Sequence, residues 1–101
     1  MKLVFSSVFE TDFAGGVEYL AREASEEIAT RWENSVYGTI AQLQKHPSLG
    51  RLRRDLHPPG IRTFSVKDFP RYLIFYTTRE KELVLLRIKH GAMNLHALFA
   101  T

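Results

Sequence analysis

Two histidines near the C-terminal end of the sequence are its best candidates for proton transfer. His90 and His96 stand six residues apart, and an imidazole side chain gains or loses its proton near neutral pH. His46 and His57 stand beside prolines, and we expect both to be solvated loop residues. The sequence holds no metal-ligand cluster, nucleophile–base motif or phosphate-cradling glycine loop. We therefore expect neither a metal nor a cofactor.

Arginines form the second candidate site. Arg51, Arg53 and Arg54 make the densest cationic cluster, and guanidinium groups bind phosphates and carboxylates through paired hydrogen bonds. The cluster opens a basic half, because residues 51–101 hold ten Lys or Arg against four Asp or Glu, whereas residues 1–50 hold four against seven. Contact with a nucleic acid or an acidic protein segment would explain this distribution. The alternative is that one arginine pairs with Asp55 and the others are solvated.

The composition bounds the kind of protein. A chain of 101 residues suffices for one compact domain, expected to span residues 1–101. No apolar run reaches the roughly 18 residues that span a bilayer. Glu10 and Asp12 interrupt the apolar start too early for a secretory signal. There is no cysteine, so disulfides and thiolate metal sites are excluded. These features favour a cytoplasmic protein without membrane association.

The elements that position these residues begin with a strand and two helices. Residues 2–8 are rich in β-branched and aromatic side chains, which predicts a strand. A first helix should follow, with Thr11 or Asp12 as its N-cap and a Gly15-Gly16 pair that weakens it. Ser25 should cap a second helix, which ends at His46-Pro47. The second helix has the clearest apolar stripe, and we expect that stripe to be core: Ile28, Trp32, Val36, Ile40 and Leu43.

The second half predicts a loop and three strands. Residues 47–60 contain three prolines and two glycines and should form a loop. Residues 61–66, 72–77 and 83–89 should be strands joined by short polar hairpin connections. The last two are apolar on both faces and should lie centrally. We expect Leu73 and Phe75 to face the helices. Tyr72, Tyr76 and Arg87 should lie on the opposite face, toward a partner.

The resulting order is strand, helix, helix and three strands. It predicts an α+β fold in which a helical hairpin packs on an antiparallel-rich four-stranded sheet.

Three stretches of sequence, in this order, resemble the RelE/ParE superfamily of toxins and are closer to its ParE branch. They are residues 47–56 (PSLGRLRRDL), residues 60–64 with 72–76 (GIRTF and YLIFY), and residues 86–99 (LRIKHGAMNLHALF). In the last stretch Met93 and Asn94 stand where the family usually has arginine and aspartate. The resemblance covers essentially the whole chain.

The resemblance implies the toxin of a type II toxin–antitoxin module, which inhibits growth and is typical of plasmid stabilization systems. ParE-like members poison DNA gyrase by protein–protein contact, without catalysis. RelE-like members cut mRNA on the ribosome. Both kinds are neutralised by a cognate antitoxin, with which they form hetero-oligomers. The resemblance therefore leaves two targets open: gyrase, or the ribosome with its mRNA.

The RelE-like alternative needs an acid–base pair beside the 2′-hydroxyl and cations on the scissile phosphate. The resemblance would assign these roles to His90, His96 and Arg62. However, Leu73 occupies the place where RelE-like relatives carry an arginine, and a leucine cannot neutralise a phosphate. The resemblance to ParE-like members also favours a hydrogen bond from His90 that holds the end of the strand. We therefore expect a gyrase inhibitor, with the endoribonuclease as the alternative.

An antitoxin should bind by adding a helix or strand along the sheet and covering exposed apolar surface. We expect it to be acidic and partly disordered. The residues expected to bind a partner combine the basic and the C-terminal apolar candidates: Arg51, Arg53, Arg54, Arg87, Leu95, Leu98 and Phe99.

Overall fold

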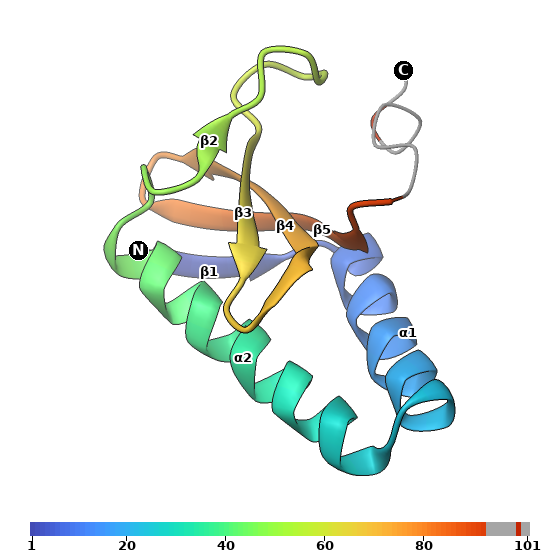
Figure 1. Cartoon of the computed structure of the whole chain (residues 1–101). Coiled ribbons are helices and arrows are strands. Elements are labelled where there is room, and N and C mark those ends of the chain that lie inside the picture. Colours follow the sequence, from blue (N-terminus) through green and yellow to red (C-terminus); the bar gives the residue numbers. More distant parts are fainter. Residues whose placement is uncertain (93–98, 100–101) are drawn as a thin grey trace.

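The computed structural model of the chain describes residues 1–92 and 99. Figure 1 shows a helical hairpin beside one twisted sheet. The elements are β1 (Lys2–Phe5), α1 (Ser7–Glu23), α2 (Glu26–Lys45), β2 (Arg51–Leu52), β3 (Arg62–Val66), β4 (Phe69–Arg79) and β5 (Glu82–His90). This confirms the expected order and the α+β class. The one addition is β2, which lies within the segment expected to be a loop.

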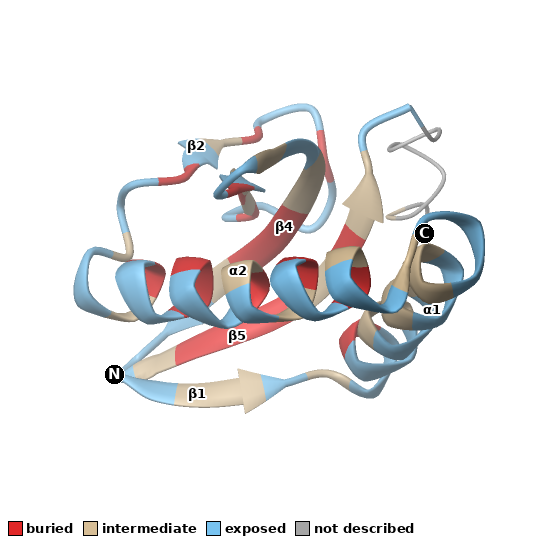
Figure 2. Cartoon of the chain, turned by 60° about the horizontal axis from the view of Figure 1, so that its bottom comes forward, coloured by how far each residue is buried: buried red, intermediate tan, exposed pale blue. Residues whose placement is uncertain are grey.

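The sheet has five strands in the order β1-β5-β4-β3-β2. β1 runs parallel to β5, and every other neighbouring pair is antiparallel. β5 and β4 therefore lie inside the sheet, as their apolar sequences predict. Figure 2 shows that the buried side of α2 faces the sheet, while its other side is exposed to solvent. The helices thus cover one face.

The N-terminal strand is shorter than expected, because Ser6 begins the first helix. Its hydroxyl oxygen accepts a hydrogen bond from the Phe9 N–H at 2.9 Å, and its O–H donates to the Leu86 carbonyl at 2.9 Å. The predicted N-caps, Thr11 and Asp12, lie inside α1. A serine before an apolar run can itself mark the start of a helix. Here the β-branched and aromatic neighbours of Ser6 favoured a longer strand instead.

The second helix agrees with its prediction. The Ser25 side chain accepts a hydrogen bond from the Ile28 N–H, Glu26 and Glu27 occupy the first turn, and His46 is the C-cap. The buried residues of α2 include four of the five predicted stripe positions: Trp32, Val36, Ile40 and Leu43.

The expected faces are wrong for β4 and for the first part of β5, where Leu83 and Leu85 belong to the main core. Ile74 and Tyr76 pack against the helices in the main core, and Leu73 and Phe75 belong to a smaller cluster with Leu56. The cause is partly a β-bulge, where Phe75 pairs with Arg87 but Tyr76 pairs with Leu85. One extra residue in a strand exchanges the faces of every side chain beyond it. A strict alternation through residues 83–89 therefore could not assign both ends of β5.

The two glycines of α1 have different surroundings. A Cβ on Gly16 would lie 2.5 Å from Cη2 of Trp32, whereas one on Gly15 would meet nothing within 4 Å. Gly16 is therefore required for the contact between α1 and the buried Trp32 indole. Gly15 has no such packing reason.

We expect opposite stability changes when helical glycines are replaced by alanine. Gly38→Ala should raise the free energy of unfolding by up to about 1 kcal/mol, because alanine favours helix and the site has open space. Gly16→Ala should lower it by about 1–3 kcal/mol, because the new methyl group collides with Trp32. Urea unfolding of both variants measures the difference. A stabilising Gly16→Ala would contradict the described contact.

Candidate functional site

The turn before β2 is held by two side chains from the sheet. The Tyr76 hydroxyl accepts a hydrogen bond from the Gly50 N–H at 2.8 Å and donates one to the Pro47 carbonyl at 2.6 Å. Arg62 donates from Nη1 to the Gly50 carbonyl at 2.7 Å. Burial raises the pKa of Tyr76 more than the Gly50 hydrogen bond and the Arg62 charge lower it, so the phenol stays protonated.

This arrangement places Arg62 in a structural role. Its guanidinium group also approaches the Ser48 carbonyl at 3.4 Å. The resemblance to RelE-like toxins makes Arg62 a candidate for contact with a scissile phosphate. In the structure its Nη1 instead donates to the backbone of the turn. The short stretches that carry the family resemblance thus have a physical basis here, since Pro47 and Gly50 meet Tyr76 and Arg62.

The cationic cluster divides in the structure. Arg53 is 7% exposed and makes a bidentate ion pair with Asp55, at 2.8 and 2.6 Å. The hydrogen bond to Asp55 raises the pKa of Arg53 despite burial. Arg51 and Arg54 are exposed, and neither has an ion-pair partner in the part of the chain that the structure describes. Arg53 is therefore the arginine that pairs with Asp55, as the alternative interpretation of the cluster allowed. Arg51 and Arg54 remain exposed and could contact an anionic partner.

Arg87 and Lys89 are both bound to Asp12 of α1. Arg87 donates from Nε and Nη2 to the two carboxylate oxygens at 2.8 and 3.1 Å, and Lys89 Nζ lies 3.2 Å from Oδ1. Asp12 also accepts the Ile88 N–H at 3.2 Å. Burial of this carboxyl, which is 4% exposed, acts to raise its pKa, but these bonds and the Arg87 charge lower it overall. Arg87, which we expected to bind a partner, thus makes an ion pair within the chain.

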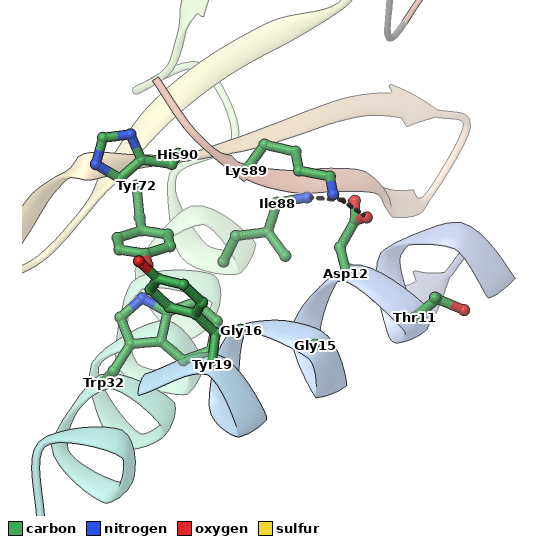
Figure 3. Close-up of a pocket in the computed structure, with 10 residues that line it drawn as sticks. All are labelled: Thr11, Asp12, Gly15, Gly16, Tyr19, Trp32, Tyr72, Ile88, Lys89 and His90. Atoms are coloured by element: carbon green, nitrogen blue, oxygen red, sulfur yellow. Dashed lines mark hydrogen bonds and ion pairs between the residues drawn. The ribbon is translucent and has the colours of Figure 1, made fainter. Parts of the chain in front are cut away.

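The Asp12 cluster has a clear structural purpose. β1 pairs with β5 only as far as Phe5 and Leu85, and beyond that point α1 follows the edge of β5. Asp12 satisfies a backbone N–H there that no strand reaches. Figure 3 shows the Ile88 N–H and Lys89 both directed at this carboxylate.

His90 ends β5 and makes local contacts. Its Nδ1 accepts a hydrogen bond from the Ala92 N–H at 3.1 Å, and its ring lies edge-on to Tyr72 with centroids 5.3 Å apart. Burial, together with the nearby Tyr19, raises the pKa of Tyr72. The hydrogen bond is the strand-end contact expected for His90. His96, the other half of the expected acid–base pair, lies outside the described residues.

The C-terminal apolar candidates are described only in part. Leu95 and Leu98 lie outside the described residues, whereas Phe99 packs on Phe75 with ring centroids 5.2 Å apart. Phe75 belongs to the face away from the helices, so Phe99 packs on that face and not on the helical hairpin. On the same face Leu73 and Arg51 line a hollow of about 520 Å³.

A cavity of about 500 Å³ lies beside α1, and we call it the α1 cavity. Figure 3 shows it between α1, one residue of α2 and the ends of the two central strands. Its walls are mainly aromatic and are formed by Tyr19, Trp32 and Tyr72. Gly15 lies on one side, and Lys89 and His90 lie at the rim. The Trp32 Nε1 is buried and has no hydrogen-bond partner within the described ranges.

The sequence alone does not predict this cavity. Trp32 was assigned to the core, and it is core, since 1% of it is exposed. Its ring nevertheless reaches the cavity through the gap that Gly16 leaves. The one signal available was the Gly15-Gly16 pair, which is unfavourable inside a helix. Among the described residues, no group of three or more His, Cys, Asp or Glu side chains could hold a metal.

A helical hairpin packs on a mixed sheet, and Tyr76 and Arg62 anchor the turn before β2. This is the α+β arrangement expected of a RelE/ParE-type toxin. The family model of the ParE toxin of type II toxin–antitoxin systems, parDE, matches residues 3–95. Toxin ParE3 of Caulobacter vibrioides is 35% identical over 88 residues, which cover 83% of this chain and 84% of that protein. The chain therefore belongs to the ParE toxin family.

A solved structure supports the fold independently. A chain from the chromosomal ParDE TA system of P. aeruginosa matches with a TM-score of 0.74 and 20% sequence identity, over 89% of this chain and 95% of that chain. In the residues that the structure describes, no helix is long and apolar enough to cross a membrane.

Proposed function

We propose that the chain inhibits DNA gyrase by protein–protein contact, without catalysis, and is neutralised by a cognate antitoxin. Membership of the ParE family is the observation that carries this proposal. The charge distribution agrees with it, because Arg51 and Arg54 remain exposed for an anionic target surface.

The geometry gives the ribonuclease alternative little support. Arg62 donates from Nη1 to backbone carbonyls. Leu73 lies on the face of the sheet away from the helices, at the position where a cation would be needed. A phosphate at this face would therefore lack a positive charge at position 73 and one of the N–H donors of Arg62, both of which would stabilise a cleavage transition state.

We expect His90→Asn to retain toxicity in full. An asparagine oxygen can still accept the Ala92 N–H, but the side chain cannot exchange a proton near neutral pH. The same should hold for His96→Asn and for the double variant. Growth after induction of each variant measures toxicity. Loss of toxicity at normal protein levels would favour the endoribonuclease.

The antitoxin should be an acidic, partly disordered protein that forms a hetero-oligomer with the toxin. Coexpression with the protein encoded by the adjacent gene tests this expectation. Induction of the toxin alone should arrest growth with chromosomal DNA breaks and intact mRNA, and coexpression should restore growth. Harmless overexpression of soluble toxin would contradict the proposal and indicate a relative that has lost toxicity. Arrest with cleaved mRNA would indicate a RelE-like activity.

A further inference from the structure

We infer that the α1 cavity is the anchor point for the antitoxin, and that it receives a large apolar side chain with a hydrogen-bond acceptor beside it. This inference rests on the proposed function, because it requires a neutralising partner. Two independent features of the cavity carry it, the open Gly15 and the unpartnered Trp32 indole.

Gly15 is the first feature. Glycine is among the least favourable residues inside a helix, and an added Cβ here would meet nothing within 4 Å. Packing within the chain therefore does not require a glycine at this position. Gly15 lines the cavity, and its missing side chain lets another backbone approach α1 closely.

The Trp32 indole is the second feature. Its Nε1 is a donor, is buried, and lacks an acceptor in the described part of the chain. Figure 3 shows this nitrogen on the side of the ring that faces Tyr19 and Tyr72, at the wall of the cavity. Buried donors normally have an acceptor. A carbonyl or carboxylate oxygen from a partner, reaching past the exposed Tyr19, would supply one.

The electrostatics of the rim favour an acceptor-rich partner. Arg87 and Lys89 share the single carboxylate of Asp12, so this ion-pair cluster, which lies beside the cavity, carries one positive charge in excess. An acidic segment complements this charge, and a basic segment does not.

The surroundings favour a protein over a small molecule. Tyr19, at the cavity, is 51% exposed, and apolar exposure continues on the helices beyond it, where Val8 is 46% and Tyr37 53% exposed. A second hollow of about 230 Å³ lies on the other side of α1, between Phe5, Phe13 and Tyr37. A segment laid along α1 would cover both hollows. Permanent complexes bury more apolar surface than transient ones, so the antitoxin fits this face better than a target enzyme does.

Gly15→Leu provides the test, with Gly38→Leu as the matched control. Both are helical glycines with open space around them, but only Gly15 lines the cavity. The probe is the purified protein encoded by the adjacent gene. We expect Gly15→Leu to weaken its binding about tenfold or more, as filling an anchor pocket does, and Gly38→Leu to bind like the wild type. Gyrase inhibition should be unchanged in both.

A spectroscopic readout reports directly on the cavity. Trp32 is the only tryptophan of the chain, so toxin labelled with fluorotryptophan has a single fluorine NMR resonance. This resonance should shift when the unlabelled antitoxin binds. Tyr19→Ala removes one exposed wall of the cavity and provides a second variant if Gly15→Leu fails to fold; it should also weaken binding.

The possible outcomes separate this inference from the proposed function. No binding of the adjacent gene product to wild-type toxin would contradict the proposed antitoxin. Normal binding by Gly15→Leu, with an unshifted fluorine resonance, would overturn the inference alone. A Gly15→Leu toxin that still binds the antitoxin normally but no longer inhibits gyrase would place the target in the cavity. A resonance that changes with toxin concentration alone would place a second copy of the chain there. Both also overturn the inference.

Discussion

Asp12→Asn is expected to lower the free energy of unfolding by about 2–3 kcal/mol near neutral pH. The carboxylate is the common partner of Arg87 and Lys89, and all three side chains are mostly buried between α1 and β5. Removing one member of a buried ion pair leaves the other charges without compensation, which typically costs about 3–5 kcal/mol. A value at or below the lower end of this range applies because 20% of Arg87 and 27% of Lys89 remain exposed.

The effect should depend on pH in a defined direction. The folded protein lowers the pKa of Asp12, so the ion pair stabilises the fold fully above the unfolded pKa of about 3.9. This contribution is lost as the pH falls through the folded pKa. The difference between wild type and Asp12→Asn should therefore be constant above about pH 5 and shrink in acid. Urea unfolding across this range measures it.

Glu18→Gln is the matched control for Asp12→Asn. Glu18 also pairs with an arginine, Arg22, but their side chains are 80% and 61% exposed. Exposed pairs of this kind contribute little to stability, so the control should change it by less than about 0.5 kcal/mol. Equal effects of the two substitutions would contradict a buried Asp12 cluster.

Tyr76→Phe is expected to lower the free energy of unfolding by about 2 kcal/mol, or roughly 8–16 °C in melting temperature. The hydroxyl accepts the Gly50 N–H and donates to the Pro47 carbonyl. Phenylalanine keeps the ring in the main core but leaves the buried Gly50 N–H unsatisfied. The loss of a buried partner costs more than the hydrogen bond contributes on average.

Tyr37→Phe is the control for the hydroxyl, because Tyr37 is 53% exposed and its hydroxyl makes no hydrogen bond with the described residues. It should leave the melting temperature nearly unchanged. Gly50→Ala should resemble Tyr76→Phe or exceed it, since its Cβ would lie 2.5 Å from the Tyr76 hydroxyl oxygen. A stable Gly50→Ala protein would show that this turn is not anchored as described.

The sequence predicted the helices better than the sheet. The apolar stripe that contains Trp32 and Val36 is a local pattern with a period near 3.6, and Ser25 and His46-Pro47 are local start and stop signals. The succession of strands along the chain also followed from β-branched, aromatic and apolar runs and from short polar connections. These features could be predicted because each depends on residues close together in the chain.

The faces of the strands could not be predicted in the same way. The β-bulge beside Phe75 depends on how two strands pair, and its shift of one residue places Ile88 on the same face as Leu83 and Leu85. β2 has only two residues, and it is a strand because Arg51 and Leu52 meet Thr63 and Arg62. Such pairings are invisible to a local pattern.

The candidate site shows the same limit. The family resemblance makes Arg62 a candidate and the basic half of the sequence makes Arg87 one, but the carbonyl and carboxylate that bind them come from residues distant in sequence. Asp12 was interpreted as a helix cap and instead joins α1 to the edge of β5. The α1 cavity required Gly15, Trp32 and Tyr72 to meet from three elements. Charge and residue type indicated candidates, and only the tertiary structure assigned their partners.

The most direct test of the proposed function is a DNA gyrase supercoiling reaction titrated with purified, folded toxin. We expect supercoiling to be inhibited as toxin is added and cleaved DNA to accumulate. Inhibition should disappear when the antitoxin is added in equal amount, and it should persist in His90→Asn. If folded toxin leaves supercoiling unchanged, gyrase is not its target, and ribosome-bound mRNA becomes the substrate to examine.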